Sequence, residues 1–339
     1  MAVDIRSLLS KLIRRESLTA EEAESAFAAI MAGEVAASQI AGLLVGLACK
    51  GETIDEITGG ARAMRRHGVP LAIASTDGVD TCGTGGDGQS TFNVSTAAAL
   101  IASAAGATVV KHGNRAMSGV VGAADVLEEL GVRIDLTPDQ VARCIAQVGL
   151  GFAFAPTFHP AMRHAAGARR ELGVRTIFNL LGPLSNPAGV RRQVIGVFAP
   201  TWVEPLAEAA RRLGSTHVLV VHSDDGLDEI SIAAETMVAE LRDGAIEVYR
   251  IVPKALGVEA GAITDLQVDS RPAAAATLRA VLEGQPGPAL EIAVANAAAA
   301  IYVAGGCGDL REGVVRAREV IASGAALQQL SRLAEVSRQ

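Results

Sequence analysis

Apolar side chains recur at the spacing of a helix face through the first seventy residues, for example within residues 43–47. Hydroxyl residues precede two of these runs, where helix N-caps are expected: Ser17 or Thr19 for one helix and Ser38 for another. The pattern therefore predicts consecutive short helices over residues 1–70.

The pattern changes at about residue 77 to short apolar runs that alternate with helical ones. The expected strands are residues 78–82, 107–111, 151–155, 193–198 and 217–222. The expected helices between them include residues 95–105, 123–130, 138–147, 160–172 and 203–213. Such alternation implies a mainly parallel sheet that is covered by helices on both faces.

Two later segments, residues 236–241 and 245–252, are separated by Arg242-Asp-Gly244 and predict a β-hairpin with Asp-Gly at its turn. From about Arg271 the chain is Ala-rich and helical again. We therefore expect an α/β fold: a small all-helical N-terminal domain, then a larger domain with a mostly parallel central sheet flanked by helices.

Composition and charge exclude several classes of protein. The length of 339 residues favours two domains over one. A net charge of −7 provides no global attraction to nucleic acid or to an anionic membrane surface. Two uncharged runs, residues 88–110 and 292–308, contain polar residues or are too short to span a bilayer, so we expect buried helices there.

The four cysteines stand far apart and form no C-x-x-C pair, which argues against a zinc site or a disulfide framework. Their spacing is typical of a protein in a reducing compartment. The first residues predict the start of an amphipathic helix rather than a signal peptide. We therefore expect a cytoplasmic location.

The most informative segment reads Asp-Thr-Cys-Gly-Thr-Gly-Gly-Asp-Gly-Gln-Ser-Thr-Phe-Asn-Val-Ser-Thr, from Asp80 to Thr96. Glycines allow close approach to a ligand, and a helix N-terminus favours phosphate. The loop matches neither the P-loop of ATPases nor a clean G-x-G-x-x-G, and a tight turn alone would also need glycine. However, an amide- and hydroxyl-rich run follows at once, and no charged residue lies between Asp87 and Lys111. Backbone amides and hydroxyls are therefore expected to hold a phosphate here.

A second polar segment, Lys111-His-Gly-Asn-Arg115, follows an expected strand, and ligands of α/β sheets bind at the carboxyl ends of strands. Lysine offers a point charge to phosphate, Gly113 permits close approach, and His112 and Asn114 are directional polar groups. The alternative is a solvated turn, which five consecutive polar or glycine residues between apolar elements make less favoured.

Two further groups carry charge. Asp228 and Glu229 lie after the expected strand 217–222 and offer the hard oxygen ligands that suit Mg²⁺, although such pairs are common on solvated surfaces. Arg169 and Arg170 lie on a basic helix that could simply face water. A guanidinium can also clamp a carboxylate, so either arginine could receive an acidic organic substrate.

In combination, the motifs GTGGD, NVST, KHGNR and LDE resemble the anthranilate phosphoribosyltransferase family. The resemblance covers nearly the whole chain, including residues 51–57 and 176–187. It implies a helical domain over residues 1–70, joined by a segment near residues 165–185, and an α/β domain over residues 71–339. It also implies a homodimer formed through the helical domain. The implied reaction is attack of the anthranilate amine on C1 of 5-phosphoribosyl 1-pyrophosphate, with release of pyrophosphate.

The resemblance also implies roles for individual residues. The expected contacts to phosphoribosyl pyrophosphate are Gly83, Gly86, Asp87, Thr91, Asn93, Val94, Ser95, Thr96, Lys111, His112, Gly113, Asn114, Arg115, Ser118, Gly119 and Ala123. The expected anthranilate contacts are Gly83, His112, Asn114 and Arg169. The expected Mg²⁺ ligands are Ser95, Asp228 and Glu229. No general acid or base is assigned.

The chain departs from the family pattern at two positions. Gly119 and Ala123 stand where the family usually has serine hydroxyls, and each loss could weaken phosphate binding by roughly 10- to 100-fold. Two other hypotheses stay open at this point. One is a pyrimidine-nucleoside phosphorylase, which would use inorganic phosphate and need no metal pair. The other is a non-catalytic relative that binds nucleic acid or a protein partner.

Overall fold

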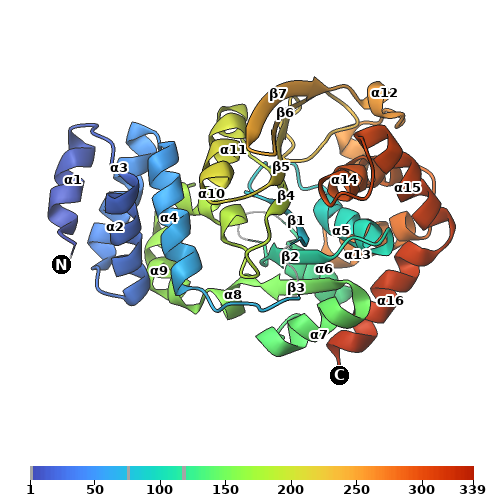
Figure 1. Cartoon of the computed structure of the whole chain (residues 1–339), viewed down its shortest axis with the longest axis horizontal. Coiled ribbons are helices and arrows are strands. Elements are labelled where there is room, and N and C mark those ends of the chain that lie inside the picture. The colour runs from blue at the N-terminus through green and yellow to red at the C-terminus, as the bar shows by residue number, and fades with distance from the viewer. Residues whose placement is uncertain (1–2, 75–76, 117–119) are drawn as a thin grey trace.

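A helical bundle stands at one end of the molecule and a seven-stranded sheet with helices on both faces forms the rest (Figure 1). The computed structural model describes residues 3–74, 77–116 and 120–339. This arrangement confirms the expected fold class. In the part of the chain so described, no helix has both the length and the apolar character needed to cross a membrane.

The bundle brings together the first helices of the chain and two that come much later. Its members are α1 (Ile5–Ile13), α2 (Ala20–Ala32), α3 (Ala37–Lys50), α4 (Ile54–His67), α9 (Arg163–Leu172) and α10 (Ile177–Leu181). Helix α9 packs against α2 and α3, while α10 packs against α4 and α3. Residues far apart in the sequence therefore share one apolar core.

Capping hydroxyls set where two of these helices begin. Thr19 forms a capping box with Glu22 at the start of α2, which confirms one of the two alternatives for this helix. The prediction that Ser38 caps α3 is wrong, because the N-cap is Ala36, which makes no side-chain cap, and Ser38 lies inside the helix. An equivalent capping box at Thr53 starts α4.

The sheet has the strand order β3-β2-β1-β4-β5-β6-β7. Its strands are β1 (Val79–Gly83), β2 (Val109–Gly113), β3 (Leu150–Phe154), β4 (Arg192–Gly196), β5 (His217–Ser223), β6 (Thr236–Arg242) and β7 (Ala245–Ile251). The first five in spatial order are parallel, and β6 and β7 form the antiparallel hairpin expected at the Asp-Gly turn. All seven predicted strands are confirmed, with ends shifted by one or two residues.

The remaining α-helices surround the sheet, some packed on its strands and others on those helices. They are α5 (Val94–Ala104), α6 (Ala123–Glu129), α7 (Pro138–Val148), α8 (Ala155–Phe158), α11 (Val203–Arg212), α12 (Pro253–Leu256), α13 (Arg271–Leu282), α14 (Pro288–Val303), α15 (Leu310–Ala322) and α16 (Ala325–Ser337). The single helix predicted over residues 160–172 is interrupted. A 3₁₀ turn at Pro160–Met162 precedes α9.

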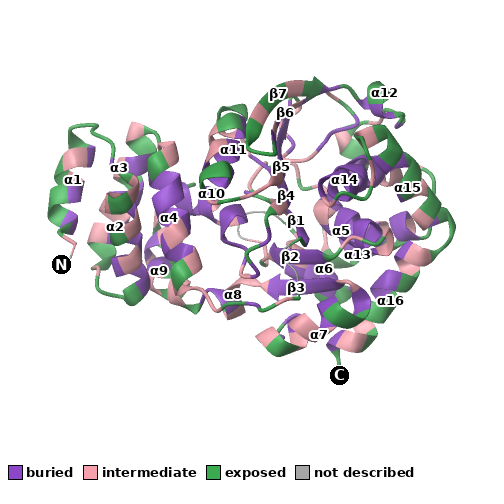
Figure 2. Ribbon diagram, viewed as in Figure 1, coloured by how far each residue is buried: buried purple, intermediate pink, exposed green. Residues whose placement is uncertain are grey.

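Alternating side chains of the central strands enter two separate apolar cores. Val194 of β4 packs into the core around α5 and α14, whereas its neighbour Ile195 packs into the core shared with the helical bundle. The buried residues concentrate on α5, α14 and the central strands (Figure 2). Because successive residues of a strand face opposite sides of the sheet, each central strand contributes side chains to both cores. The packing of the two cores therefore holds the ends of these strands in place.

A glycine sets the close approach of α2 and α4. A Cβ added at Gly59 would overlap the carbonyl oxygen of Ala20 and lie 2.8 Å from the amide nitrogen of Glu24. At Gly167, in α9, an added Cβ would meet no atom within 4 Å. We expect Gly59→Ala to lower the free energy of unfolding by about 1–3 kcal/mol through overpacking. Gly167→Ala, as the matched control, is expected to raise it by up to about 1 kcal/mol through helix propensity.

Urea denaturation of the two variants and the wild type measures both effects. Equal stability of Gly59→Ala and Gly167→Ala would contradict the close contact between α2 and α4.

Candidate active site

The strand order places a topological switch point at the centre of the sheet. From β1 the chain continues outward through β2 and β3, whereas β4 and β5 extend the sheet from the other side of β1. Ligands of open α/β sheets bind outside the carboxyl ends of the strands at such a point. The segments that follow β1 and β5 meet there with the end of β2, and together they carry the motifs GTGGD, NVST, KHGNR and LDE.

A carboxylate pair lies at this point. The N–H of Gly85 donates to Oδ2 of Asp228 at 3.1 Å. The N–H of Ser95, at the start of α5, donates to Oε1 of Glu229 at 3.2 Å. A Cβ on Gly196 would overlap the carbonyl oxygen of Asp228, so the end of β4 must be glycine for this loop to lie against it. The structure thus brings the predicted metal ligands together with the glycine loop.

These carboxylates lack full charge compensation. Burial, and then the nearby charge of Asp87, raises the pKa of Asp228 to about 7. Burial, and then the charge of Asp228, also raises the pKa of Glu229, which Lys111 partly offsets. Bringing such groups together in a half-buried site favours a cation between them and their surroundings.

The donor set fits Mg²⁺ better than a metal enclosed wholly by protein. Within residues 3–74, 77–116 and 120–339, no group of three or more histidine, cysteine, aspartate or glutamate side chains is arranged to hold a metal ion. A pair of carboxylates is sufficient for Mg²⁺, which keeps several waters and shares substrate phosphates as ligands.

Lys111 lies under the site in the middle of β2 and is buried. Its ammonium donates to the carbonyl oxygen of Thr81 and to Oγ of Ser95, the latter at 3.2 Å. Burial lowers the pKa of Lys111, and the neighbouring charge of Asp80 opposes that effect. The lysine therefore supplies positive charge from beneath the loops.

The glycine loop turns through left-handed backbone conformations. Gly85, Gly86 and Gly88 have φ angles of 65°, 79° and 78°. The loop is tied to the segment between α9 and α10, because the guanidinium of Arg175 donates to the carbonyl oxygen of Gly86. The same guanidinium stacks on the Phe198 ring, 4.7 Å from its centroid. Sequence reasoning missed Arg175, whose position one residue before the 176–187 motif was the available signal.

The amide- and hydroxyl-rich run joins this loop to the next one. Nδ2 of Asn93 donates to the carbonyl oxygen of Val121 at 3.1 Å. In the described part of the chain, Oδ1 of Asn93 and Oγ1 of Thr96 are buried and have no hydrogen-bond partner. Val94 instead buries its side chain in the core, and Thr91 forms an isolated bridge with Gln267. Unpartnered buried oxygens at a helix start are available to a ligand.

The motif Lys111-His-Gly-Asn-Arg115 begins inside the protein and ends at the surface. The N–H of His112 donates to Oδ1 of Asp80 at 3.1 Å, and its ring lies 5.0 Å from that of His159. Gly113 must lack a side chain because an added Cβ would lie 2.9 Å from the Phe152 ring. Asn114 is exposed and caps its own turn by accepting from the N–H of Arg115.

Arg115 is paired within the protein. Its guanidinium lies 3.0 Å from Asp125 and 2.7 Å from Glu128. The buried Asp125 also accepts from the N–H groups of Ala116 and Gly122, so it braces the loop before α6. Of the remaining predicted phosphate contacts, Ala123 is the first residue of α6, and Ser118 and Gly119 lie outside the described residues.

Arg169, on α9, stacks on the ring of Phe178 with its guanidinium 5.1 Å from the ring centroid. Burial lowers its pKa. Among the residues that the structure describes, its guanidinium has no hydrogen bond or ion pair. In the described part of the chain no hydrogen bond joins it to Gly83, His112 or Asn114. Its neighbour Arg170 is exposed.

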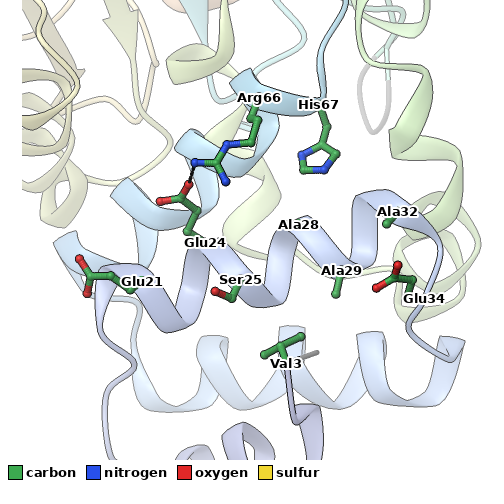
Figure 3. Close-up of a pocket in the computed structure, with 10 residues that line it drawn as sticks. All are labelled: Val3, Glu21, Glu24, Ser25, Ala28, Ala29, Ala32, Glu34, Arg66 and His67. Carbon is green, nitrogen blue, oxygen red and sulfur yellow. Dashed lines mark ion pairs between the residues drawn. The ribbon is translucent and has the colours of Figure 1, made fainter. Parts of the chain in front are cut away.

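A hollow of about 410 Å³ lies elsewhere, on the helical bundle (Figure 3). The side chains around it come from α2, the C-terminal end of α4 and the segments beside them, and Glu24 and Arg66 pair across it. None of the loops at the strand ends contributes to it. We therefore place the candidate site at the sheet and not in this hollow.

Family models and similar proteins match this chain over nearly its full length. Residues 6–68 match the family described as "Glycosyl transferase family, helical bundle domain", and residues 75–327 match "Glycosyl transferase family, a/b domain". The chain is 52% identical over 331 residues to an anthranilate phosphoribosyltransferase of Thioalkalivibrio sulfidiphilus, covering 98% of each.

Solved structures are similar over the same length. The crystal structure of anthranilate phosphoribosyltransferase from Thermus thermophilus superposes with a TM-score of 0.92 at 45% identity, covering 98% of this chain and 99% of that one. The Saccharomyces cerevisiae enzyme in complex with phosphoribosyl pyrophosphate and Mg has a TM-score of 0.90 at 27% identity, with 98% of each chain covered.

The burial of His112 makes the stability of the protein depend on pH. Burial, and then the nearby His159, lowers the pKa of His112 to about 3, while a hydrogen bond with the Gly182 backbone opposes this. Unfolding would return the pKa to about 6.5, so the unfolded state binds more protons as the pH falls below that value. We expect His112 alone to remove about 2 kcal/mol of stability between pH 8 and pH 5.

Denaturation of the wild type and His112→Asn at the two pH values tests this expectation. The variant is expected to lose less stability on acidification, because it carries no imidazole to protonate. An identical loss in both proteins would show that His112 is not the group responsible.

Proposed function

The chain belongs to the anthranilate phosphoribosyltransferase family, and we propose that it transfers the phosphoribosyl group from 5-phosphoribosyl 1-pyrophosphate to the amine of anthranilate. The product is N-(5-phosphoribosyl)anthranilate, an intermediate of tryptophan biosynthesis. The observation that carries this proposal is the under-compensated carboxylate pair of Asp228 and Glu229, held against a glycine loop at the switch point of the sheet.

The reaction requires positioning and charge stabilisation more than proton abstraction. The amine nitrogen forms a bond to C1 of the ribose, the bond from C1 to the pyrophosphate oxygen breaks, and the nitrogen then loses a proton. An aromatic amine is already neutral at pH 7, so a strong general base is not needed to activate it. Positive charge develops on the ribosyl centre while pyrophosphate leaves, which makes electrostatics and orientation the main contributions of the protein.

The residues proposed to bind phosphoribosyl pyrophosphate lie in two stretches of the sequence, from the last residue of β1 to the first turn of α5 and from β2 to the first residue of α6. They are Gly83, Gly86, Asp87, Thr91, Asn93, Val94, Ser95, Thr96, Lys111, His112, Gly113, Asn114, Arg115, Ser118, Gly119 and Ala123. The unpartnered oxygens of Asn93 and Thr96 support this assignment. The side chain of Val94 lies in the apolar core, so this residue could contact the ligand only through its backbone. Arg115 would have to share its guanidinium between the ligand and its present partners, Asp125 and Glu128.

We propose Asp228, Glu229 and Ser95 as the residues that hold Mg²⁺. When bound, the cation supplies positive charge to the leaving pyrophosphate. Ser95 offers its hydroxyl oxygen, and its N–H already orients Glu229. The similarity to the Saccharomyces cerevisiae enzyme, whose structure is in complex with phosphoribosyl pyrophosphate and Mg, supports this proposal.

Anthranilate is proposed to bind between Gly83, His112, Asn114 and Arg169. Among described residues the guanidinium of Arg169 has no ion-pair partner, which suits the carboxylate of the substrate, because an arginine can donate two parallel hydrogen bonds. The unpartnered Nε2 of His112 supports a polar contact nearby in the part of the chain that the structure describes.

The assembly and location are also proposals. We propose a cytoplasmic homodimer formed through the helical domain, taken as residues 1–70 with the segment near residues 165–185. Two apolar side chains on this domain support a contact surface, since Ile13 and Val45 are 82% and 39% exposed. A pyrimidine-nucleoside phosphorylase is disfavoured because the relatives matched at full length carry the transferase name.

Arg169 is the first residue to test for anthranilate recognition. We expect Arg169→Ala to raise the KM for anthranilate by roughly 10- to 100-fold, because a charge-assisted hydrogen bond is lost. The KM for phosphoribosyl pyrophosphate is expected to stay within about twofold of the wild type. Arg170→Ala removes an exposed guanidinium of the same helix and is the matched control. An unchanged anthranilate KM in Arg169→Ala would remove Arg169 from the site.

The loss of anthranilate fluorescence during turnover, followed with and without Mg²⁺, tests both the reaction and the carboxylate pair. We expect Mg²⁺-dependent turnover in the wild type and at least a tenfold loss in Asp228→Asn and in Glu229→Gln. Asp224→Asn is the control, because this carboxylate is exposed and pairs with Arg250. No turnover by the wild type at millimolar substrates would contradict the proposed function itself.

A further inference from the structure

The buried side-chain amide of Asn296, on α14, forms hydrogen bonds with the backbone directly after Asp228 and Glu229. Oδ1 of Asn296 accepts from the N–H of Ile230 at 2.9 Å. Its Nδ2 donates to the carbonyl oxygen of the same residue at 2.9 Å and to the carbonyl oxygen of Ile292 at 2.9 Å. The amide therefore fixes the two peptide groups on either side of Ile230 and leaves little rotational freedom at that residue.

Two hydroxyls hold the other ends of the same peptide groups. Oγ of Ser223, the last residue of β5, donates to the carbonyl oxygen of Glu229 at 2.7 Å. The N–H of Ser231 donates to Oγ of Ser223 and Oγ1 of Thr236, both at 3.2 Å. All four polar atoms of two consecutive peptide groups thus have side-chain partners.

The proton order in this network follows from the count of donors. Ser223 has a single hydroxyl proton, which it gives to Glu229, so the 2.6 Å contact with Thr236 requires the Thr236 hydroxyl to donate. Each hydroxyl then has one orientation. A fully satisfied buried network of this kind specifies one backbone conformation.

The position of Asn296 in its helix indicates that the amide is there for this contact. Among the buried residues of α14, Asn296 is 2% exposed and is surrounded in sequence by alanine, valine and isoleucine. A buried amide costs stability unless its hydrogen bonds are made. Helix α14 also packs against α5, whose first turn provides the N–H that orients the Glu229 carboxylate. One pair of packed helices therefore fixes both the backbone and the carboxylate of Glu229.

We infer that Asn296 is a positioning residue that holds the backbone of residues 229–231 so that the Glu229 carboxylate faces the same cation as Asp228. This inference rests on the proposed role of the pair as Mg²⁺ ligands. Ser223, on β5, and Thr236, on β6, hold the same two peptide groups through their hydroxyls. None of the three side chains touches substrate or metal in this assignment, so the effect of each is transmitted through the peptide groups of residues 229–231.

Asn296→Leu removes the amide and keeps an apolar side chain of similar size. We expect the Mg²⁺ concentration for half-maximal turnover to rise about tenfold, while the anthranilate KM stays within about twofold. Calorimetric titration of phosphoribosyl pyrophosphate in the presence of Mg²⁺, without anthranilate, provides a readout other than activity. A similar weakening of binding is expected there.

Gln329→Leu is the matched control for a structural role alone. Gln329 is also a buried helix amide, and it donates to Oγ of Ser103 and the carbonyl oxygen of Val148, away from the carboxylate pair. Both variants are expected to lower the melting temperature, and Asn296→Leu alone is expected to change the Mg²⁺ dependence. Equal Mg²⁺ dependence in the two variants would overturn the inference.

Thr236→Val carries the same test if Asn296→Leu fails to fold. It removes one hydroxyl without changing side-chain volume, and a severalfold rise in the Mg²⁺ requirement, reversed in Thr236→Ser, is expected. Wild-type Mg²⁺ dependence in Thr236→Val would contradict the inferred positioning role of this hydrogen-bond network. Failure of the wild type to depend on Mg²⁺ would instead contradict the metal assignment under the proposed function, which separates the two results.

Discussion

The arrangement of the candidate site depends on two adjacent, half-buried carboxylates, Asp228 and Glu229, which lie at the centre of the sheet. Asp228 and Glu229 can lie there because β4 ends in Gly196, where a side chain would overlap the backbone of Asp228. The first turn of α5 offers an amide to Glu229, and Lys111 brings an ammonium beneath the pair. A strand end, a helix start and a buried lysine must therefore keep a fixed relation, which the packed sheet provides.

The two apolar cores explain how that relation is kept. Val194 of β4 faces the core of α5 and α14, and Ile195 faces the core that continues into the helical bundle. A displacement of β4 would disturb both cores, and close-packed interiors resist such shifts. The bundle, which carries Arg169, is thus held in register with the loops at the strand ends. The groups proposed to recognise the substrates, which come from distant parts of the sequence, are thereby held in a fixed relation.

Local patterns in the sequence predicted the parts of this architecture that depend on neighbouring residues. Strand and helix alternation, the Asp-Gly hairpin and the loop motifs at strand ends follow from local patterns. The cap at Ser38 was wrong because the hydroxyl has no free helix start to reach, α3 having begun at Ala37. Arg175 and Asn296 escaped sequence reasoning because their partners, Gly86 and Ile230, are far away in the chain. The long-range packing that joins them leaves no periodic signal.

The charges of the site favour binding a cation and a diphosphate together. The basic groups described near the phosphate loops are already engaged: Lys111 with Thr81 and Ser95, Arg115 with Asp125 and Glu128, and Arg175 with Gly86. A bare diphosphate would meet amides, hydroxyls and the charge of Lys111 beside two carboxylates, which repel it. A divalent cation cancels that repulsion and is itself bound more tightly when phosphate oxygens complete its coordination. We therefore expect each of the two proposed ligands to increase the affinity for the other, as linked binding requires.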